Sequence, residues 1–324
     1  MKNWLARLFG APSQAAPEPV TAPDSPVPAG AGVVDPPPAF DLDLAFYRSL
    51  TLGAAHAGES PEQLILDELA RLARQPGAAA ELVPRVPAVI PQLLRSLRMD
   101  ATSSSELARQ VSQDVSLVAE VIREVNSPYY RATAKIASIE GALMLLGQNG
   151  LRMLLARVAF RPVIGMQGGR LARQAAPQVW SQSEKCAMAA SMAAPRHGAD
   201  PFEATLAGLM HNVGLIVALR LADQVAGAAP LPQSDGFAHA LLDGARRLSA
   251  GIAGLWEFPP GVAQAILQAG QFEATPLARA LQEGDRLAKL RVLCDAGSAE
   301  AKALAATLSG PQANVFDRLR PHED

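Results

Sequence analysis

Residues 200–220, DPFEATLAGLMHNVGLIVALR, limit what this chain can fold into more than any other stretch. Asp200 suits a helix N-cap, and Pro201 suits the first helical position, where an N–H would have no helical partner. The residues that follow are apolar on most sides, which predicts one buried central helix over 200–220. A polar pair, His211-Asn212, interrupts it. A buried polar pair needs hydrogen-bond partners, so it marks either a satisfied core network or a functional site.

Proline, glycine and capping residues divide the rest of the sequence into further helices. No strand pattern or repeat is visible, and the abundance of alanine and leucine, with few aromatic residues, favours helices over strands. The sequence therefore predicts an all-α, multi-helix bundle. The other expected helices are 42–56, 60–74, 104–112, 115–125, 139–146, 150–160, 171–193, 237–255, 260–269, 276–293 and 299–308, with a break over 162–169.

The N-terminal region differs from the rest in composition. Residues 1–40 are rich in proline and alanine and cannot bury enough apolar surface to fold, which predicts a disordered arm and linker. Within it, residues 1–10 place apolar side chains on one helical face. A frayed terminus is our first interpretation, and a hook for a membrane surface or a partner groove is the second. We expect a helical lead-in over 41–80, a main domain over 81–295, and a C-terminal helix and tail over 296–324.

Charge and cysteine content exclude some classes of protein. The formal net charge of −2 argues against a general nucleic-acid binder. Cys186 and Cys294 lack metal-binding spacing, which favours two buried, reduced thiols in a cytoplasmic protein. No uncharged apolar run approaches the ~18 residues that a membrane span needs, and no signal peptide is visible. The sequence also contains no Walker A, dinucleotide-binding or nucleophile-elbow motif.

Several short motifs follow one another along the sequence. They are Val86-Pro87, Ser105-Glu106-Leu107-Ala108, Val111-Ser112-Gln113-Asp114, Val125-Asn126-Ser127-Pro128-Tyr129-Tyr130, Ser138-Ile139-Glu140-Gly141-Ala142, Leu145-Leu146-Gly147, Ala207-Gly208-Leu209-Met210-His211-Asn212-Val213-Gly214 and Trp256-Glu257-Phe258-Pro259. Taken in order, these motifs resemble HDOD domains. The resemblance covers roughly residues 84–290, and the Asn-Ser and Leu-Gly motifs are its most specific parts. HDOD domains are similar to the HD metal-dependent phosphohydrolases but form a non-catalytic branch, which implies an all-helical fold and a regulatory role in bacterial signalling.

The resemblance also indicates where a metal site would lie. HD enzymes bind metal through an early histidine, an adjacent His-Asp pair and a later aspartate. In this sequence the early histidine falls near Gln182, the pair aligns with His211-Asn212, and the late aspartate aligns with Asp285. Two neutral amides thus replace a ligand and an anion, so we expect no tightly bound metal and no cofactor. We interpret Gln182, His211, Asn212 and Asp285 as a residual hydrogen-bond network.

One stretch has an unusual charge pattern. Between Gly141 and Ser183 there is no acidic residue, whereas Arg152, Arg157 and Arg161 all occur. These arginines are candidates for contact with an acidic partner or with a phosphorylated ligand such as a nucleotide second messenger. The alternative is a solvated face whose acidic complement comes from elsewhere in the fold.

These observations lead to one main functional prediction and two alternatives. The main prediction is a cytoplasmic, non-catalytic bacterial signalling module that binds other regulatory proteins, with no nucleic acid as partner. The first alternative is a degenerate HD-type phosphohydrolase or a nucleotide-binding sensor. The second is a scaffold tethered to a membrane or a partner by residues 1–10.

Overall fold

The structure is a computed structural model of the 324-residue chain. It describes residues 40–51, 61–75, 115–127, 135–165, 168–227 and 231–320, together with the single positions 77, 82, 91, 109, 111, 112 and 130. The predictions for the arm 1–40, its first ten residues and the helix 104–112 lie outside these residues or almost entirely so. Residues 40–324 form one compact unit.

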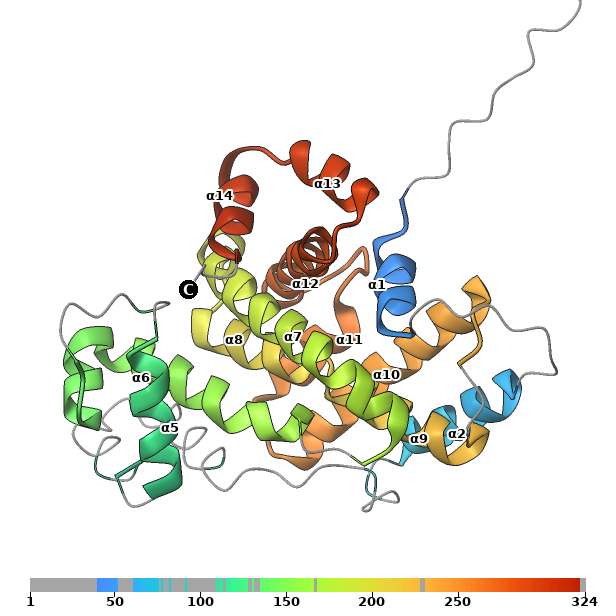
Figure 1. Cartoon of the computed structure of the whole chain (residues 1–324), viewed down its shortest axis with the longest axis horizontal. Coiled ribbons are helices and arrows are strands. Elements are labelled where there is room, and N and C mark those ends of the chain that lie inside the picture. The colour runs from blue at the N-terminus through green and yellow to red at the C-terminus, as the bar shows by residue number, and fades with distance from the viewer. Residues whose placement is uncertain are drawn as a thin grey trace, which may run out of the picture. The chain divides into compact units, whose positions relative to one another are not determined.

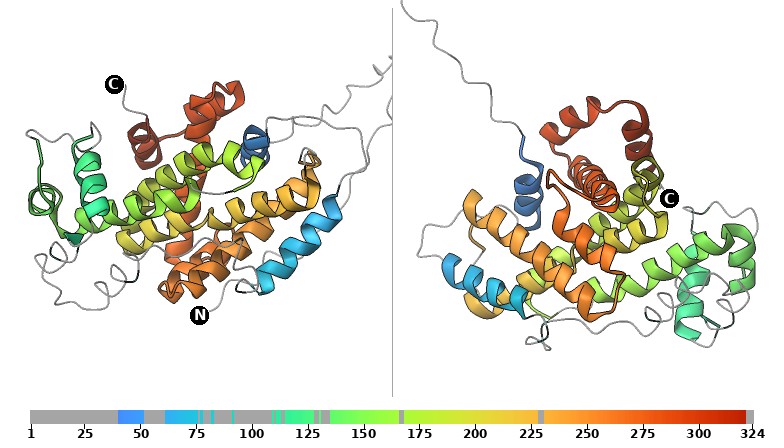
Figure 2. Two further views of the ribbon diagram at one scale, coloured as in Figure 1. Left: turned by 60° about the horizontal axis from the view of Figure 1, so that its bottom comes forward. Right: turned by 180° about the vertical axis from the view of Figure 1, so that it is seen from behind.

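Every regular element in the described residues is a helix, which confirms the predicted fold class (Figure 1). The helices are α1 (Leu42–Thr51), α2 (Glu62–Arg74), α5 (Val115–Val125), α6 (Ile139–Gly165), α7 (Arg170–His197), α8 (Pro201–Met210), α9 (Val213–Ala226), α10 (Asp235–Leu255), α11 (Pro260–Gln268), α12 (Pro276–Asp295), α13 (Ala299–Ala306) and α14 (Gly310–Arg318). The turned views keep α5 at one end of this unit and α2 at the other, with α7 between them (Figure 2).

Helix α7 is the centre of the packing, since α8 and α12 lie directly against it. Two glycines permit this close approach. A Cβ atom on Gly208 of α8 would collide with the α7 backbone at Ala187, and one on Gly284 of α12 would lie only 2.8 Å from the Cys186 carbonyl oxygen. Small residues at both crossings therefore bring polar side chains on α7, α8 and α12 within hydrogen-bond reach of one another.

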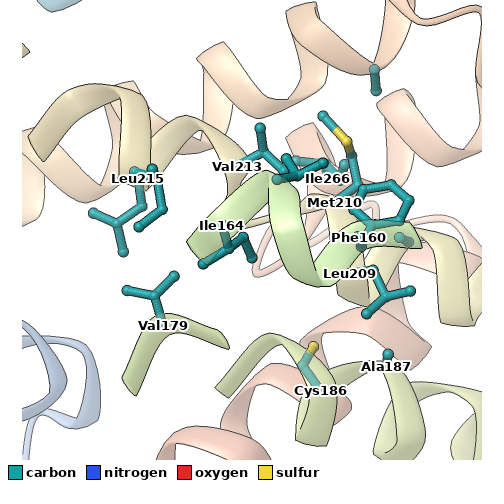
Figure 3. Close-up of a cluster of buried hydrophobic side chains, with 14 of the residues drawn as sticks. Phe160, Ile164, Val179, Cys186, Ala187, Leu209, Met210, Val213, Leu215 and Ile266 are labelled. Carbon is teal, nitrogen blue, oxygen red and sulfur yellow. The ribbon is translucent and has the colours of Figure 1, made fainter. Parts of the chain in front are cut away.

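The core around these crossings is apolar (Figure 3). Burial of such side chains supplies most of the stability of helices of this length. The labelled members come from α6 (Phe160, Ile164), α7 (Val179, Cys186, Ala187), α8 (Leu209, Met210), α9 (Val213, Leu215) and α11 (Ile266).

The prediction of a single helix over 200–220 is wrong, because the chain forms α8 and α9 with a break at His211-Asn212. Asp200 does cap α8, accepting from the N–H groups of Phe202 and Glu203. The break has a tertiary cause: Ser249 of α10 donates its hydroxyl proton to the His211 carbonyl at 2.6 Å and accepts from the Gly214 N–H at 2.8 Å. A side chain inserted into the helical ladder in this way interrupts it.

The predicted break over 162–169 begins too early, because α6 continues through Pro162 to Gly165. Val163 and Ile164 are buried, so packing outweighs the backbone hydrogen bond that proline removes. The predicted end of a helix at Gly147 does correspond to a kink, where φ is 69°. Only glycine adopts this conformation readily.

The most apolar stretch, Pro201–Ala226, is long and apolar enough to cross a membrane, with a mean hydropathy of 1.5. It is nevertheless 89% buried within the protein. It comprises α8 and α9, which lie against α7, α10 and α11, as core helices of a folded domain do.

Candidate functional site

The structure brings all four residues of the expected HD-like network together. Gln182 projects from α7, His211 and Asn212 form the turn between α8 and α9, and Asp285 projects from α12. The Gln182 amide donates to Asp285 Oδ1 at 2.6 Å, and His211 Nε2 lies 3.2 Å from the same oxygen.

The side-chain amides of Gln182 and Asn212 are hydrogen-bonded to each other. Gln182 accepts on Oε1 from the Asn212 side-chain amide, which also lies 3.3 Å from Ser183 Oγ. Gln182, Asn212 and Ser183 are all buried. Because buried polar groups need partners, this pairing removes the desolvation penalty that two isolated amides would carry.

Both ring nitrogens of His211 face oxygen atoms. Nδ1 lies 2.7 Å from the Gly208 carbonyl oxygen, one turn earlier on α8, and Nε2 faces Asp285. The Gly208 carbonyl fixes the ring orientation in the manner of the backbone contacts that orient many histidines in proteins. The His211 carbonyl in turn accepts from Ser249, so the ring and the backbone of this residue are both held.

A lysine that the sequence analysis did not single out completes the site. Lys289 lies one turn beyond Asp285 on α12, and its ammonium is 2.6 Å from Asp285 Oδ2 and 2.6 Å from Asp43 Oδ1 of α1. Burial alone would lower the pKa of Lys289, but the two carboxylates outweigh it and raise that pKa. Likewise, burial alone would raise the pKa of Asp285, but Lys289 and His211 hold it well below its usual range.

The side chains present do not fit a divalent metal ion. Cys186, His211 and Asp285 offer ligand atoms within 4.8 Å of one another. However, burial and the nearby Asp285 charge raise the pKa of the Cys186 thiol, and only the thiolate is a good ligand. Asp285 already accepts from Gln182 and Lys289, and the ammonium of Lys289 would repel a second cation.

One of the candidate arginines on α6, Arg157, already has acidic partners within the fold. Arg157 forms ion pairs with Glu124 of α5 and Glu184 of α7, and its guanidinium lies 6.0 Å from the centre of the Tyr130 ring. Arg161 is exposed, and Arg152 is half-buried. Arg157 therefore receives its acidic partners from outside the acid-free stretch. Arg157 and Arg161 both line a surface pocket beside Trp180.

Sequence reasoning missed Lys289 and Asp43. The spacing of Asp285 and Lys289, four residues apart on a predicted helix, was a signal for an ion pair along one face. Nothing in the sequence connected Asp43 to them, since 246 residues separate Asp43 from Lys289.

Comparison with known proteins gives a family match and several proteins of the same fold. The HDOD domain family model matches residues 83–272. An uncharacterized protein from Treponema pallidum (strain Nichols) is 25% identical over 137 residues. The aligned region spans 42% of this chain but only 26% of that relative.

Solved structures with the same fold include several bacterial proteins. An HDOD domain protein of unknown function from Geobacter sulfurreducens superposes with a TM-score of 0.57 at 24% identity, over 78% of this chain and 89% of the other. A protein from Shewanella amazonensis SB2B, provisionally named a metal-dependent phosphohydrolase, gives 0.55 at 17% identity over 80% and 97%. A protein from Marinobacter aquaeolei VT8, provisionally named a signal transduction protein, gives 0.51 at 20% identity over 84% and 69%. Because the family model spans more than half of the sequence, this chain belongs to the HDOD domain family.

Proposed function

We propose that this protein is a non-catalytic bacterial signalling module that acts by binding other regulatory proteins. The observation that carries the proposal is the chemistry at the HD-like site. Amides stand where a ligand and a bridging carboxylate would be needed, and the remaining aspartate is paired with a lysine. Such a site lacks the open coordination position at which a metal ion activates water.

Two further features support a binding role. The polar groups at the site are engaged with one another, which suits a rigid scaffold better than a reaction centre that must receive substrate. One solved protein with this fold carries a provisional name as a signal transduction protein. The competing proposal, hydrolysis of a phosphodiester by a degenerate HD site, requires His211 and Asp285 to act with a metal ion.

The test compares the wild-type protein with two histidine variants. His211→Ala removes the site histidine, and His239→Ala removes an exposed histidine that pairs with Asp41 on the surface. Metal content of protein purified without chelators is measured by elemental analysis. Hydrolysis of bis(p-nitrophenyl) phosphate and of a cyclic dinucleotide is measured with and without added Mn²⁺.

We expect substoichiometric metal and background hydrolysis in all three proteins. Hydrolysis by the wild type and by His239→Ala that disappears in His211→Ala would overturn the proposal. So would a full equivalent of bound metal that is lost only in His211→Ala.

A further inference from the structure

The ion pair at the site joins two parts of the chain that lie outside the HDOD match. The family model ends at residue 272, so it covers neither Asp285 and Lys289 of α12 nor Asp43 of α1. Within the described residues, α1 and α12 thus lie outside the span of the family model, and Asp43, Asp285 and Lys289 meet at the position that the resemblance assigns to the HD metal site.

Helix α1 lies against α12, α7 and α10 through apolar and polar contacts. Phe46 is fully buried, and the Lys289 ammonium lies 5.8 Å from the centre of its ring. Tyr47 is also buried and donates its hydroxyl proton to the Pro232 carbonyl at 2.6 Å. Gln178 of α7 donates to Ser49 Oγ at 2.6 Å. These contacts hold Asp43 in place above Lys289.

The ammonium of Lys289 has the surroundings of a bound cation. Its side chain is only 10% exposed, two carboxylate oxygens lie at 2.6 Å, and an aromatic face covers it. Asp43 is half-exposed, whereas Asp285 lies mostly within the protein. A carboxylate held away from water is unfavourable unless a positive charge compensates it. In an HD enzyme a metal ion supplies that charge, whereas here a covalently attached ammonium does.

We propose that Lys289 is a built-in cation that takes the place of a divalent metal ion in this site. Asp43, one of its two carboxylate partners, makes α1 part of the site. Removal of the ammonium leaves a latent divalent-cation site at the vacated position between Asp43 Oδ1 and Asp285 Oδ2, with His211 beside the other Asp285 oxygen. Oxygen and imidazole ligands of this kind suit Mn²⁺. This inference rests on the proposed non-catalytic function.

The experiment is titration of purified protein with MnCl₂ by isothermal calorimetry, comparing the wild type with Lys289→Ala. The wild type is expected to show no saturable binding. Lys289→Ala is expected to bind one equivalent of Mn²⁺ with an affinity at least ~100-fold above that of the wild type. The substitution removes a repelling cation and leaves two carboxylates uncompensated. Asp43→Asn in the Lys289→Ala background should weaken this new binding.

Lys185→Ala is the matched control, because Lys185 is a half-buried lysine on α7 that donates to Ser181 and does not contact Asp285. It should bind Mn²⁺ no better than the wild type. Where Lys289→Ala fails to fold, circular dichroism with and without Mn²⁺ gives the readout, since a bound ion stabilises the folded state by mass action.

Each outcome has one meaning. Mn²⁺ binding or Mn²⁺-dependent folding that is gained only in Lys289→Ala supports the inference. A Lys289→Ala protein that neither binds Mn²⁺ better than Lys185→Ala nor folds in its presence overturns it. His211-dependent hydrolysis by the wild type would instead overturn the proposed function, so the two failures can be told apart.

Discussion

Two cationic side chains in this protein each lie between two carboxylates, yet they join different parts of the chain. Arg157 on α6 pairs with Glu124 and Glu184, all within the HDOD match of residues 83–272. Lys289 on α12 pairs with Asp285 and Asp43, all outside it. The first arrangement braces the family domain internally. The second joins α12 to α1, two helices that lie outside the matched span.

The two arrangements also differ in what surrounds them. The Arg157 cluster lines a surface pocket, where water can replace a lost partner. Lys289 is buried beside Phe46, and its partner Asp285 hydrogen-bonds Gln182 and His211. Removal of the cation should therefore be more damaging at the second site, because Lys289 is the more buried cation and the Asp285 carboxylate that it compensates is held among protein partners.

The largest effect is expected for Lys289→Ala in metal-free buffer. It should lower the free energy of unfolding by about 3–5 kcal/mol, since it leaves a buried carboxylate uncompensated. Arg157→Ala should lower it by about 1–2 kcal/mol, since the Arg157 side chain is itself more exposed than that of Lys289, 20% against 10%. Urea denaturation followed by circular dichroism measures both. Equal losses in the two variants would contradict the distinction between the sites.

Asp285→Asn should have the next largest effect, about 1–3 kcal/mol at neutral pH, because the amide keeps the shape but loses the charge. The effect should depend on pH with a definite sign. The pKa of Asp285 is lowered in the folded state, so its stabilisation is present above the unfolded pKa of about 4 and is lost as pH falls below it.

The stability difference between the wild type and Asp285→Asn should therefore be constant from about pH 5 to pH 9 and shrink below about pH 4. The pKa of Lys289 is raised, so its contribution is present below about pH 10 and is lost only at higher pH. Denaturation curves recorded across this range test the prediction. A difference that grew as the pH fell would contradict the assignment of Asp285 as a charged partner.

The smallest effects are expected at exposed positions. Asp43 is half-exposed, so Asp43→Asn should cost about 0.5–1 kcal/mol. Arg161→Ala should change the free energy of unfolding by less than about 0.5 kcal/mol, because its side chain is on the surface. Thermal unfolding of both variants beside the wild type provides the measurement. A larger loss for Arg161→Ala than for Asp43→Asn would reverse the expected order.

Much of the candidate site was visible in the sequence. The resemblance placed Gln182, His211, Asn212 and Asp285 at one location, and the structure brings them within hydrogen-bond distance. The loss of two ligand types could be judged without coordinates, because an amide is a poor substitute for imidazole or carboxylate. The functional role of the network stays a prediction that the experiments above address.

The limits of the sequence are clearest at His211 and Lys289. Local patterns predicted a helix through His211, but Ser249, 38 residues later, interrupts that helix by hydrogen bonding to its backbone. The pairing of Lys289 with Asp285 follows from helical spacing, whereas its pairing with Asp43 spans 246 residues. Long-range contacts of this kind leave no periodic signal.

The sequence by itself determined the all-helical fold and most helix positions. These properties depend on interactions between residues close together in the chain, such as capping, apolar periodicity and proline placement. The tertiary structure alone decided where the central apolar stretch breaks, which acidic residues neutralise Arg157, and that a lysine supplies the positive charge at the site. Those outcomes depend on which side chains meet in the core, where burial makes each unpaired charge or hydrogen-bonding group unfavourable.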